Sequence, residues 1–219
     1  MKLIPTVLML WLVPLLGCAQ TAQPPQPPSN GATTDQVTPQ PSPQAEPPSH
    51  DTPTSPPAQQ EVAILAGGCF WGMEQILRQI PGVLDTEVGY TGGHMLQPRY
   101  EDTHHGKSGH AEAVRVTFDP TRLTYATLLE DWFFRMHDPT TLNRQGNDIG
   151  TQYRSAIFVL NEAQRTTAEQ VKQRVAASGK WSDPIVTQVV KAGHFWKAED
   201  YHQDYLVKHP SGYTCHYLR

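Results

Sequence analysis

A proline-rich stretch near the start of this chain limits which residues can form a folded core. Residues 19–60 consist mainly of Pro, Gln, Ser, Thr and Ala, with almost no large apolar side chain. Such a segment cannot bury enough apolar surface to offset the entropy lost on ordering, so we expect a disordered tether with polyproline character. Its contour could reach roughly 130 Å. The core must therefore be built from residues 61–219, enough for one domain.

The first 18 residues have the organisation of an export signal. A lysine precedes an apolar run from Leu3 to Leu16, which is too short for a comfortable transmembrane helix but has the size of a signal-peptide core. The run leads into Leu-Leu-Gly-Cys, which resembles the lipobox of bacterial lipoproteins and implies that Cys18 is lipidated. An uncleaved anchor or an ordinary signal peptide is the alternative. We expect an extracytoplasmic protein, anchored to a membrane of the cell envelope or periplasm.

Charge and cysteine content narrow the function classes. The net charge is −4, and the chain has no run of basic residues, so we do not expect nucleic-acid binding. Because Cys18 belongs to the export signal, Cys69 and Cys215 are the cysteines left for the folded domain. Two cysteines in an exported domain indicate either one structural disulfide or a redox-cycling pair. The surroundings of Cys69 must decide between these readings.

Hydrophobic periodicity predicts strands and helices that interleave. We expect strands over 62–66, 83–91, 110–118, 153–160 and 185–190. Helices are expected over 73–80, 123–136 and 162–177, and a helix or helical turn over 197–207. Polar loops are expected over 94–109 and 140–152. The predicted class is α/β or α+β: a two-layer sandwich of helices on a mixed β-sheet, with a ferredoxin-like core and a long, loop-rich C-terminal part.

The sequence Gly-Gly-Cys-Phe-Trp-Gly over residues 67–72 lies between the first predicted strand and helix. This layout puts Cys69 at or next to a helix N-terminus, where unpaired N–H groups and the helix dipole favour a negative charge. We therefore expect a lowered thiol pKa and a thiolate nucleophile. Phe70 and Trp71 can form the wall of an apolar pocket. At this point a buried structural cysteine remains the alternative.

Glu112 is the second candidate for chemistry. In the strand over 110–118, the two-residue period places Glu112 on the same face as Val114, Val116 and Phe118, which is the expected core face. Burial should raise the pKa of this carboxyl, so that it could act as a general acid. The alternative is a glutamate at the strand end that reaches solvent.

Two tyrosines and an aspartate are further candidates. Tyr90 shares a predicted strand face with Leu84 and Val88, and it can either donate a hydrogen bond into a cavity or pack in the core. The polar segment Asn-Asp-Ile-Gly-Thr-Gln-Tyr could bring Asp148 and Tyr153 to the same cavity, although an ordinary Asx-type turn explains it equally well. No histidine has the spacing of a zinc motif, so we expect no metal site. A Cys–His hydrolase or acyltransferase stays open, with no histidine marked for it.

Several separated motifs together resemble the peptide methionine sulfoxide reductases of the A type. The resemblance runs from about Val62 to the C-terminus. The matching segments, in family order, are Gly68–Trp71, Gly89–Gly93, Gly109–Val114, Gln145–Tyr153 and the tail Gly212–His216. Two departures stand out: Ile149 occupies a position where many relatives carry histidine, and the tail holds a single cysteine.

The resemblance implies a role for each candidate in reducing a methionine sulfoxide. Cys69 would attack the sulfur as a thiolate, and Glu112 would protonate the oxygen. Tyr90 and Tyr153 would donate hydrogen bonds to the oxygen. Phe70 and Trp71 would hold the S-methyl group, and Asp148 would order polar contacts nearby. The family acts on the S epimer, in proteins and in free methionine sulfoxide. No second, zinc-bearing module is visible, so we expect no activity on the R epimer.

The resemblance also implies how the enzyme is recycled. Cys69 would be left as a sulfenic acid, and Cys215 would condense with it to form a disulfide. A thioredoxin-like reductant, or dithiothreitol in vitro, would reopen that disulfide. The glycine-bearing tail would swing in only after the first step. We expect oxidised proteins and peptides as partners, no bound cofactor, and a monomer.

Overall fold

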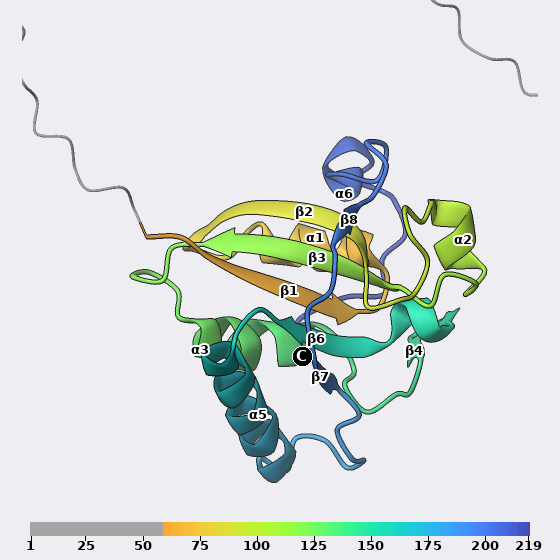
Figure 1. Ribbon diagram of the computed structural model, residues 1–219. Helices are drawn as coiled ribbons and strands as arrows, with labels where there is room; N and C mark the ends of the chain where they lie inside the picture. The colour runs from red at the N-terminus through yellow and green to blue at the C-terminus, as the bar shows by residue number, and fades with distance from the viewer. Residues whose placement is uncertain (1–58) are drawn as a thin grey trace, which may run out of the picture. The chain divides into compact units, whose positions relative to one another are not determined.

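The computed structural model describes residues 59–219, so the predicted export signal and all but the last two residues of the predicted tether lie outside the described part (Figure 1). Within that part, none of the helices has the length and apolar character needed to cross a membrane. The elements in chain order are β1 (Glu61–Gly67), α1 (Phe70–Leu77), β2 (Val83–Thr91), α2 (Tyr100–His104), β3 (Ala111–Phe118), α3 (Tyr125–Thr127), the π-helical η1 (Leu128–Phe133), α4 (Phe134–Met136), β4 (Arg144–Gln145), β5 (Asp148–Ile149), the 3-10 turn η2 (Thr151–Tyr153), β6 (Ser155–Val159), α5 (Glu162–Ala177), β7 (Gln188–Lys191), β8 (Trp196–Lys197) and α6 (Tyr205–Lys208).

The main sheet has the strand order β7-β6-β1-β3-β2-β8. Its neighbouring strands are antiparallel except for the parallel pair β6 and β7, so the sheet is mixed. In the central four strands, α1 connects β1 to β2, and the α3–η1–α4 run connects β3 to β6. This is the split βαβ arrangement of ferredoxin-like folds. The predicted fold class is confirmed.

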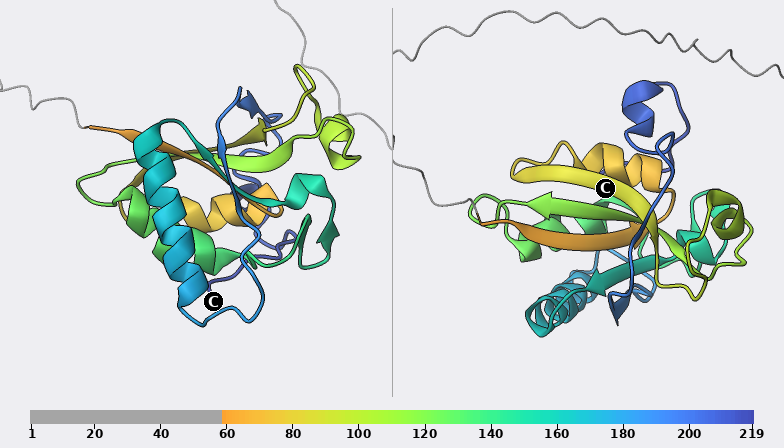
Figure 2. Two further views of the ribbon diagram at one scale, coloured as in Figure 1. Left: turned by 60° about the horizontal axis from the view of Figure 1, so that its bottom comes forward. Right: turned by 45° about the horizontal axis from the view of Figure 1, so that its top comes forward.

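Helices cover one face of the sheet and an extended segment covers part of the other. Leu65 and Val114 pack on the helical side with Met73 of α1 and Val171 of α5. On the opposite side, small residues of β1, β3 and β6 pack against Phe195. Phe195 belongs to the segment from β7 to β8, which crosses over this face of the sheet (Figures 1 and 2). Both faces of β1 are therefore buried near its C-terminal end, where the Gly-Gly-Cys turn follows.

The structure corrects the predicted face of Leu84. A register shift between Val83 and Asp85 interrupts the pairing of β2 with β3, and Leu84 is 46% exposed. Val88 and Tyr90, further along β2, are both fully buried. The irregularity is a β-bulge, which changes the alternation of faces that a regular strand would keep.

Other boundaries differ in detail from the expected ones. The stretch 94–109 is not entirely a loop, because α2 lies within it. The first turn of α2 is stabilised by the Asp102 carboxylate, which accepts the Arg99 N–H. The region 197–207 contains the end of β8, a turn and the start of the four-residue helix α6 rather than one helix. By contrast, the predicted cap of α5 is confirmed, since the Asn161 side chain accepts the Gln164 N–H at 2.9 Å.

Candidate active site

The site begins where β1 ends. Gly68 has a φ of 115°, and a Cβ there would lie 2.6 Å from the Gln145 side chain, so both the backbone and the space require glycine. The turn places Cys69 at the N-cap of α1, as expected. Cys69 is buried and Cys215 is partly buried, and both are free thiols.

The pKa of Cys69 is a correction to the sequence-based expectation. Burial raises this pKa well above its ordinary value, and a charge on Glu112 would raise it further. The backbone N–H of Trp71 favours the thiolate, as predicted for a helix N-terminus, but its effect is smaller than that of burial. Desolvation dominates because so little water reaches the sulfur, while α1 is only eight residues long.

Glu112 points into the interior from β3, on the face predicted for it. Its Oε2 accepts the Phe70 N–H at 3.1 Å, and the side chain is buried. Burial raises the pKa of Glu112 to about 8; the Phe70 N–H opposes this rise, and the charge of Asp148 adds to it. The carboxyl is therefore mostly protonated at neutral pH. A neutral Glu112 also removes the charge that would disfavour a Cys69 thiolate.

Cys69 and Glu112 face the same cavity, which has a volume of about 190 Å³. The lining residues are Cys69, Phe70, Trp71, Tyr100, His104, Glu112, Asp148, Tyr153 and Tyr213. The structure thus brings together six of the eight domain residues proposed from sequence. Tyr100, His104 and Tyr213 were missed: the first two stand in a stretch interpreted as a loop, and the third is marked only by its place two residues before Cys215.

Tyr90 is not among the residues that line this cavity. Its hydroxyl donates to Glu199 Oε2 at 2.9 Å, and its ring is fully buried. The other oxygen of Glu199 accepts the Tyr100 N–H at 3.0 Å. Tyr90 therefore supports the cavity wall, since it pairs with Glu112 across β2 and β3 and its ring lies 5.9 Å from the Phe70 ring, centroid to centroid. Its hydroxyl is used by Glu199, and Tyr100 provides the lining tyrosine that Tyr90 was expected to be. Burial, and then the charge of Glu112, raises the pKa of Tyr100 to about 12.

The indole of Trp71 is fixed from two sides. It stacks on Tyr205 with ring centroids 3.7 Å apart and planes 11° apart. Its Nε1 donates to His202 Nδ1 at 3.1 Å. The Phe70 ring lies 5.2 Å from the same histidine ring, centroid to centroid. The C-terminal segment therefore holds the two aromatic residues that α1 contributes to the cavity wall.

Cys215 lies beside the cavity rather than in its lining. Its Sγ donates to Asp148 Oδ2 at 3.3 Å. Burial, and then the hydrogen bond and charge of Asp148, raises the pKa of Cys215 to about 12, whereas the backbone N–H of Cys69 lowers it. The tail is thus already next to Cys69 while both thiols are free. The expectation that it arrives only after the first step is not what this reduced structure shows.

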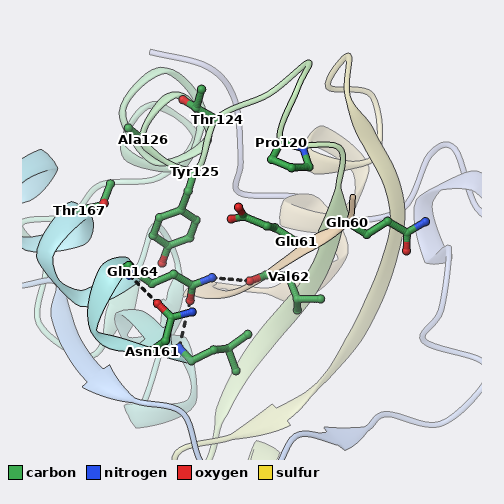
Figure 3. A pocket seen from close by; sticks show the side chains of 12 residues that line it. Gln60, Glu61, Val62, Pro120, Thr124, Tyr125, Ala126, Asn161, Gln164 and Thr167 are labelled. Carbon is green, nitrogen blue, oxygen red and sulfur yellow. Dashed lines mark hydrogen bonds between the residues drawn. The ribbon is translucent and has the colours of Figure 1, made fainter. Parts of the chain in front are cut away.

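A larger cavity, of about 740 Å³, lies around Glu61 and Val62 at the opposite end of β1 (Figure 3). It contains no cysteine, and Gln164 in its wall is engaged in bonds to the backbone of Val62 and Leu160. Within residues 59–219, no three His, Cys, Asp or Glu side chains are grouped to hold a metal ion. Both cysteines of the described residues lie in or beside the smaller cavity.

Comparison with known proteins gives a consistent result. A sequence profile of the family described as "Peptide methionine sulfoxide reductase" matches residues 61–219. A peptide methionine sulfoxide reductase MsrA of Nocardia farcinica (strain IFM 10152) is 57% identical over 157 residues, covering 72% of this chain and 89% of its own length.

Solved structures agree with the sequence comparison. Reduced Mxr1 from Saccharomyces cerevisiae superimposes with a TM-score of 0.70 and 38% identity, covering 76% of this chain and 96% of the yeast chain. Mxr1 in complex with Trx2 gives a TM-score of 0.51 and 29% identity, with coverages of 77% and 96%. Because the profile spans the whole described domain apart from its first two residues, this chain belongs to the peptide methionine sulfoxide reductase family.

Proposed function

We propose that this chain reduces methionine S-sulfoxide, in proteins and as the free amino acid, with Cys69 as nucleophile and Glu112 as proton donor. One observation carries the assignment: a thiol and a carboxyl with a pKa of about 8 share a 190 Å³ cavity with two fixed aromatic rings. A sulfoxide is a poor electrophile until its oxygen is protonated, so it needs a neutral acid opposite a sulfur nucleophile. The site supplies both.

In the first step, the Glu112 proton moves to the sulfoxide oxygen while the Cys69 sulfur attacks, and the Cys69 thiol proton passes to the Glu112 carboxylate that is left. The oxygen passes from the substrate sulfur to Cys69, which becomes a sulfenic acid, and methionine leaves. Cys69 is oxidised by two electrons and the sulfoxide is reduced by two. The neutral state of Glu112 has two effects: it supplies the proton for the oxygen, and it places no negative charge beside Cys69 as the thiol loses its proton.

The tyrosine hydroxyls hold the oxygen in this proposal. Tyr100 and Tyr153 both line the cavity, and burial raises the pKa of each, so both remain protonated donors at neutral pH. Tyr100 takes the part that the sequence suggested for Tyr90. Phe70 and Trp71 receive the S-methyl group, and Asp148 orders polar contacts at the rim.

In the second step, the Cys215 sulfur attacks the sulfur of the Cys69 sulfenic acid. The Cys69–Cys215 disulfide forms, and the hydroxyl leaves as water with the proton of the Cys215 thiol. A thioredoxin-like reductant then reopens the disulfide by thiol–disulfide exchange. The complex of yeast Mxr1 with Trx2 supports a reductant of this kind.

The decisive test supplies the purified protein with methionine S-sulfoxide and dithiothreitol and measures the methionine formed, with the R epimer as control. We expect turnover of the S epimer alone, and a mass lower by two hydrogens across Cys69 and Cys215 when reductant is omitted. The Cys215→Ser variant should complete one turnover with thioredoxin and then stop. Absence of methionine from the unmodified protein would refute the proposed activity, and sustained thioredoxin-driven turnover of the variant would remove Cys215 from its role.

We further propose that the chain is an extracytoplasmic lipoprotein attached through Cys18. The apolar run before Leu-Leu-Gly-Cys and the proline-rich stretch after it support a lipid anchor with a spacer. The full chain produced in a bacterial host should partition into the detergent phase and carry a diacyl mass at Cys18. The Cys18→Ala variant should lose both properties, and unchanged partitioning of the variant would contradict lipidation.

A further inference from the structure

We propose that His216 is a positioning residue for the resolving step: it fixes the tail on the Gly-Gly-Cys turn and holds the Cys215 thiol ready to attack Cys69. This inference rests on the proposed function, in which Cys215 resolves the Cys69 sulfenic acid. His216 follows the resolving cysteine directly and is not needed for the reduction of the sulfoxide itself.

His216 connects the tail to the end of β1. Its Nε2 lies 2.9 Å from the carbonyl oxygen of Gly67, two residues before Cys69, in a buried hydrogen bond. Its own backbone N–H donates to Thr214 Oγ1 at 3.1 Å, which closes a local turn around Cys215. His216 is 7% exposed although it is the fourth residue from the C-terminus. The His216 side chain is thus the buried anchor next to Cys215, while Arg219 ties the end of the tail to Arg135 and Lys180.

Two glycines of the motif make room for this anchor. A Cβ at Gly72 would lie 2.6 Å from His216 Nδ1 and 2.3 Å from Thr214 Oγ1. A Cβ at Gly68 would lie 3.0 Å from His216 Cε1. Glycine inside a helix costs stability relative to alanine, so its presence at Gly72 needs a reason. The docked tail supplies that reason.

The hydrogen bond to Gly67 also fixes the tautomer of His216. A carbonyl oxygen can only accept, so Nε2 must carry the proton. Burial lowers the pKa of His216 to about 4, so the ring is neutral near pH 7 and Nδ1 keeps its lone pair. Nδ1 lies 3.5 Å from Cys215 Sγ, and Asp148 Oδ2 lies 3.3 Å from the same sulfur. The thiol is therefore held between two acceptors.

This arrangement has a kinetic consequence. The attack of Cys215 on the sulfenic acid is intramolecular, and its rate depends on how often the two sulfurs meet in the reacting geometry. Without the His216 bond, Cys215 would be held by the Asp148 contact and by the more distant Arg219 bonds, and its sulfur would spend less time in the reacting geometry. Loss of the imidazole should slow disulfide formation and leave methionine formation unchanged.

The test compares two rates in one single-turnover experiment on the reduced protein with methionine S-sulfoxide. Methionine reports the first step, the loss of two hydrogens by mass spectrometry reports the disulfide, and dimedone traps any remaining sulfenic acid. We expect the His216→Phe variant to form methionine at the wild-type rate but to form the disulfide about ten-fold more slowly or worse, with a trapped adduct on Cys69. His216→Gln can still donate to the Gly67 carbonyl and should recover most of that loss.

A matched control separates positioning from stability. His137 is a second buried, neutral histidine that packs against Gly67, and its Nε2 lies 2.7 Å from Ser155 Oγ. The His137→Phe variant should lower the midpoint of thermal unfolding without changing the ratio of the two rates. An equal fall in that ratio for both histidine variants would show general loosening and overturn the proposal.

Gly72→Ala provides a variant that leaves His216 intact. Its methyl group should displace the tail and slow disulfide formation as His216→Phe does, which keeps the proposal testable if the histidine variant fails to fold. A disulfide rate within about two-fold of wild type in both folded variants would overturn it. If the unmodified protein forms no methionine, the proposed function fails instead, so the two failures are distinguishable.

Discussion

The two ends of β1 carry two different cavities. The cavity near Glu61 is about four times larger than the one near Cys69, at about 740 Å³ against about 190 Å³. At the larger cavity, the Gln164 side-chain amide forms hydrogen bonds with the backbone of Val62 and Leu160, so both of its polar atoms are already engaged (Figure 3). At the smaller one, a thiol and a carboxyl with raised pKa values face open space. Reactive groups with shifted pKa values identify the site, and volume does not.

We expect the largest effect on activity from replacing the nucleophile of the small cavity. The Cys69→Ser variant should lose methionine formation by about a thousand-fold or more, because a serine hydroxyl is a far weaker nucleophile than a thiolate. The matched variant in the large cavity, Thr167→Val, should keep turnover within about two-fold. The assay is methionine release under dithiothreitol. Retained turnover in Cys69→Ser would remove the small cavity from the reaction.

The next effect concerns the proton donor. In the Glu112→Gln variant the amide keeps the shape and can still accept the Phe70 N–H, but it cannot protonate the sulfoxide oxygen. The single-turnover rate of methionine formation, measured by rapid quench, should fall by about a hundred-fold or more. An unchanged rate would contradict the assignment of Glu112 as the acid.

Glu112 should also make stability depend on pH. Its pKa is about 8 in the folded chain, against 4.5 ordinarily, so the native state holds a proton that the unfolded state releases between those values. The free energy of unfolding should therefore fall as pH rises from about 4.5 to about 8, and this part should be absent in Glu112→Gln. Denaturant titrations of both proteins across this window measure the difference. Parallel curves would show that the carboxyl is not desolvated.

Removing the hydroxyl of Tyr100 or of Tyr90 compares a tyrosine that lines the cavity with one that does not. The Tyr100→Phe variant removes a hydroxyl from the cavity and should slow the single-turnover step by about ten-fold. The Tyr90→Phe variant removes a buried bond to Glu199 and should cost about 1 kcal/mol or more of stability, with a smaller effect on rate. Rapid-quench rates and unfolding midpoints of both variants measure the effects on rate and on stability. A larger rate loss in Tyr90→Phe would restore the sequence-based expectation.

Local sequence rules were sufficient wherever a residue's role depends on its own strand or turn. The two-residue period placed Glu112 on the core face, and the glycine turn placed Cys69 at a helix start. The same rules failed for Leu84, where a bulge interrupts the period. A bulge depends on how two strands pair, and the sequence of one strand alone does not reveal it.

The remaining differences come from contacts distant in sequence. Tyr90 precedes a glycine turn, whereas Tyr100 opens α2 in a stretch expected to be a loop. Only the fold reveals that Glu199, about a hundred residues away, accepts the Tyr90 hydroxyl, and that the Tyr100 side chain lines the cavity. Likewise, the helix-terminus argument for Cys69 omitted the burial that dominates its pKa. Periodicity predicts a face, but it does not predict how much water the assembled elements exclude.

The smallest expected effect on activity lies at the other end of β1. Gln164 donates to the Val62 carbonyl at 2.8 Å and accepts the Leu160 N–H at 3.0 Å, so Gln164→Leu leaves two backbone groups of the large cavity without partners. Stability should fall by about 1–3 kcal/mol. The rate of methionine formation should stay within about two-fold, because β1 separates this cavity from Cys69 by about 20 Å. Urea titration and rapid quench on the same variant measure both quantities. A loss of rate without a loss of stability would mean that the two ends of β1 are coupled, and that the large cavity takes part in the reaction after all.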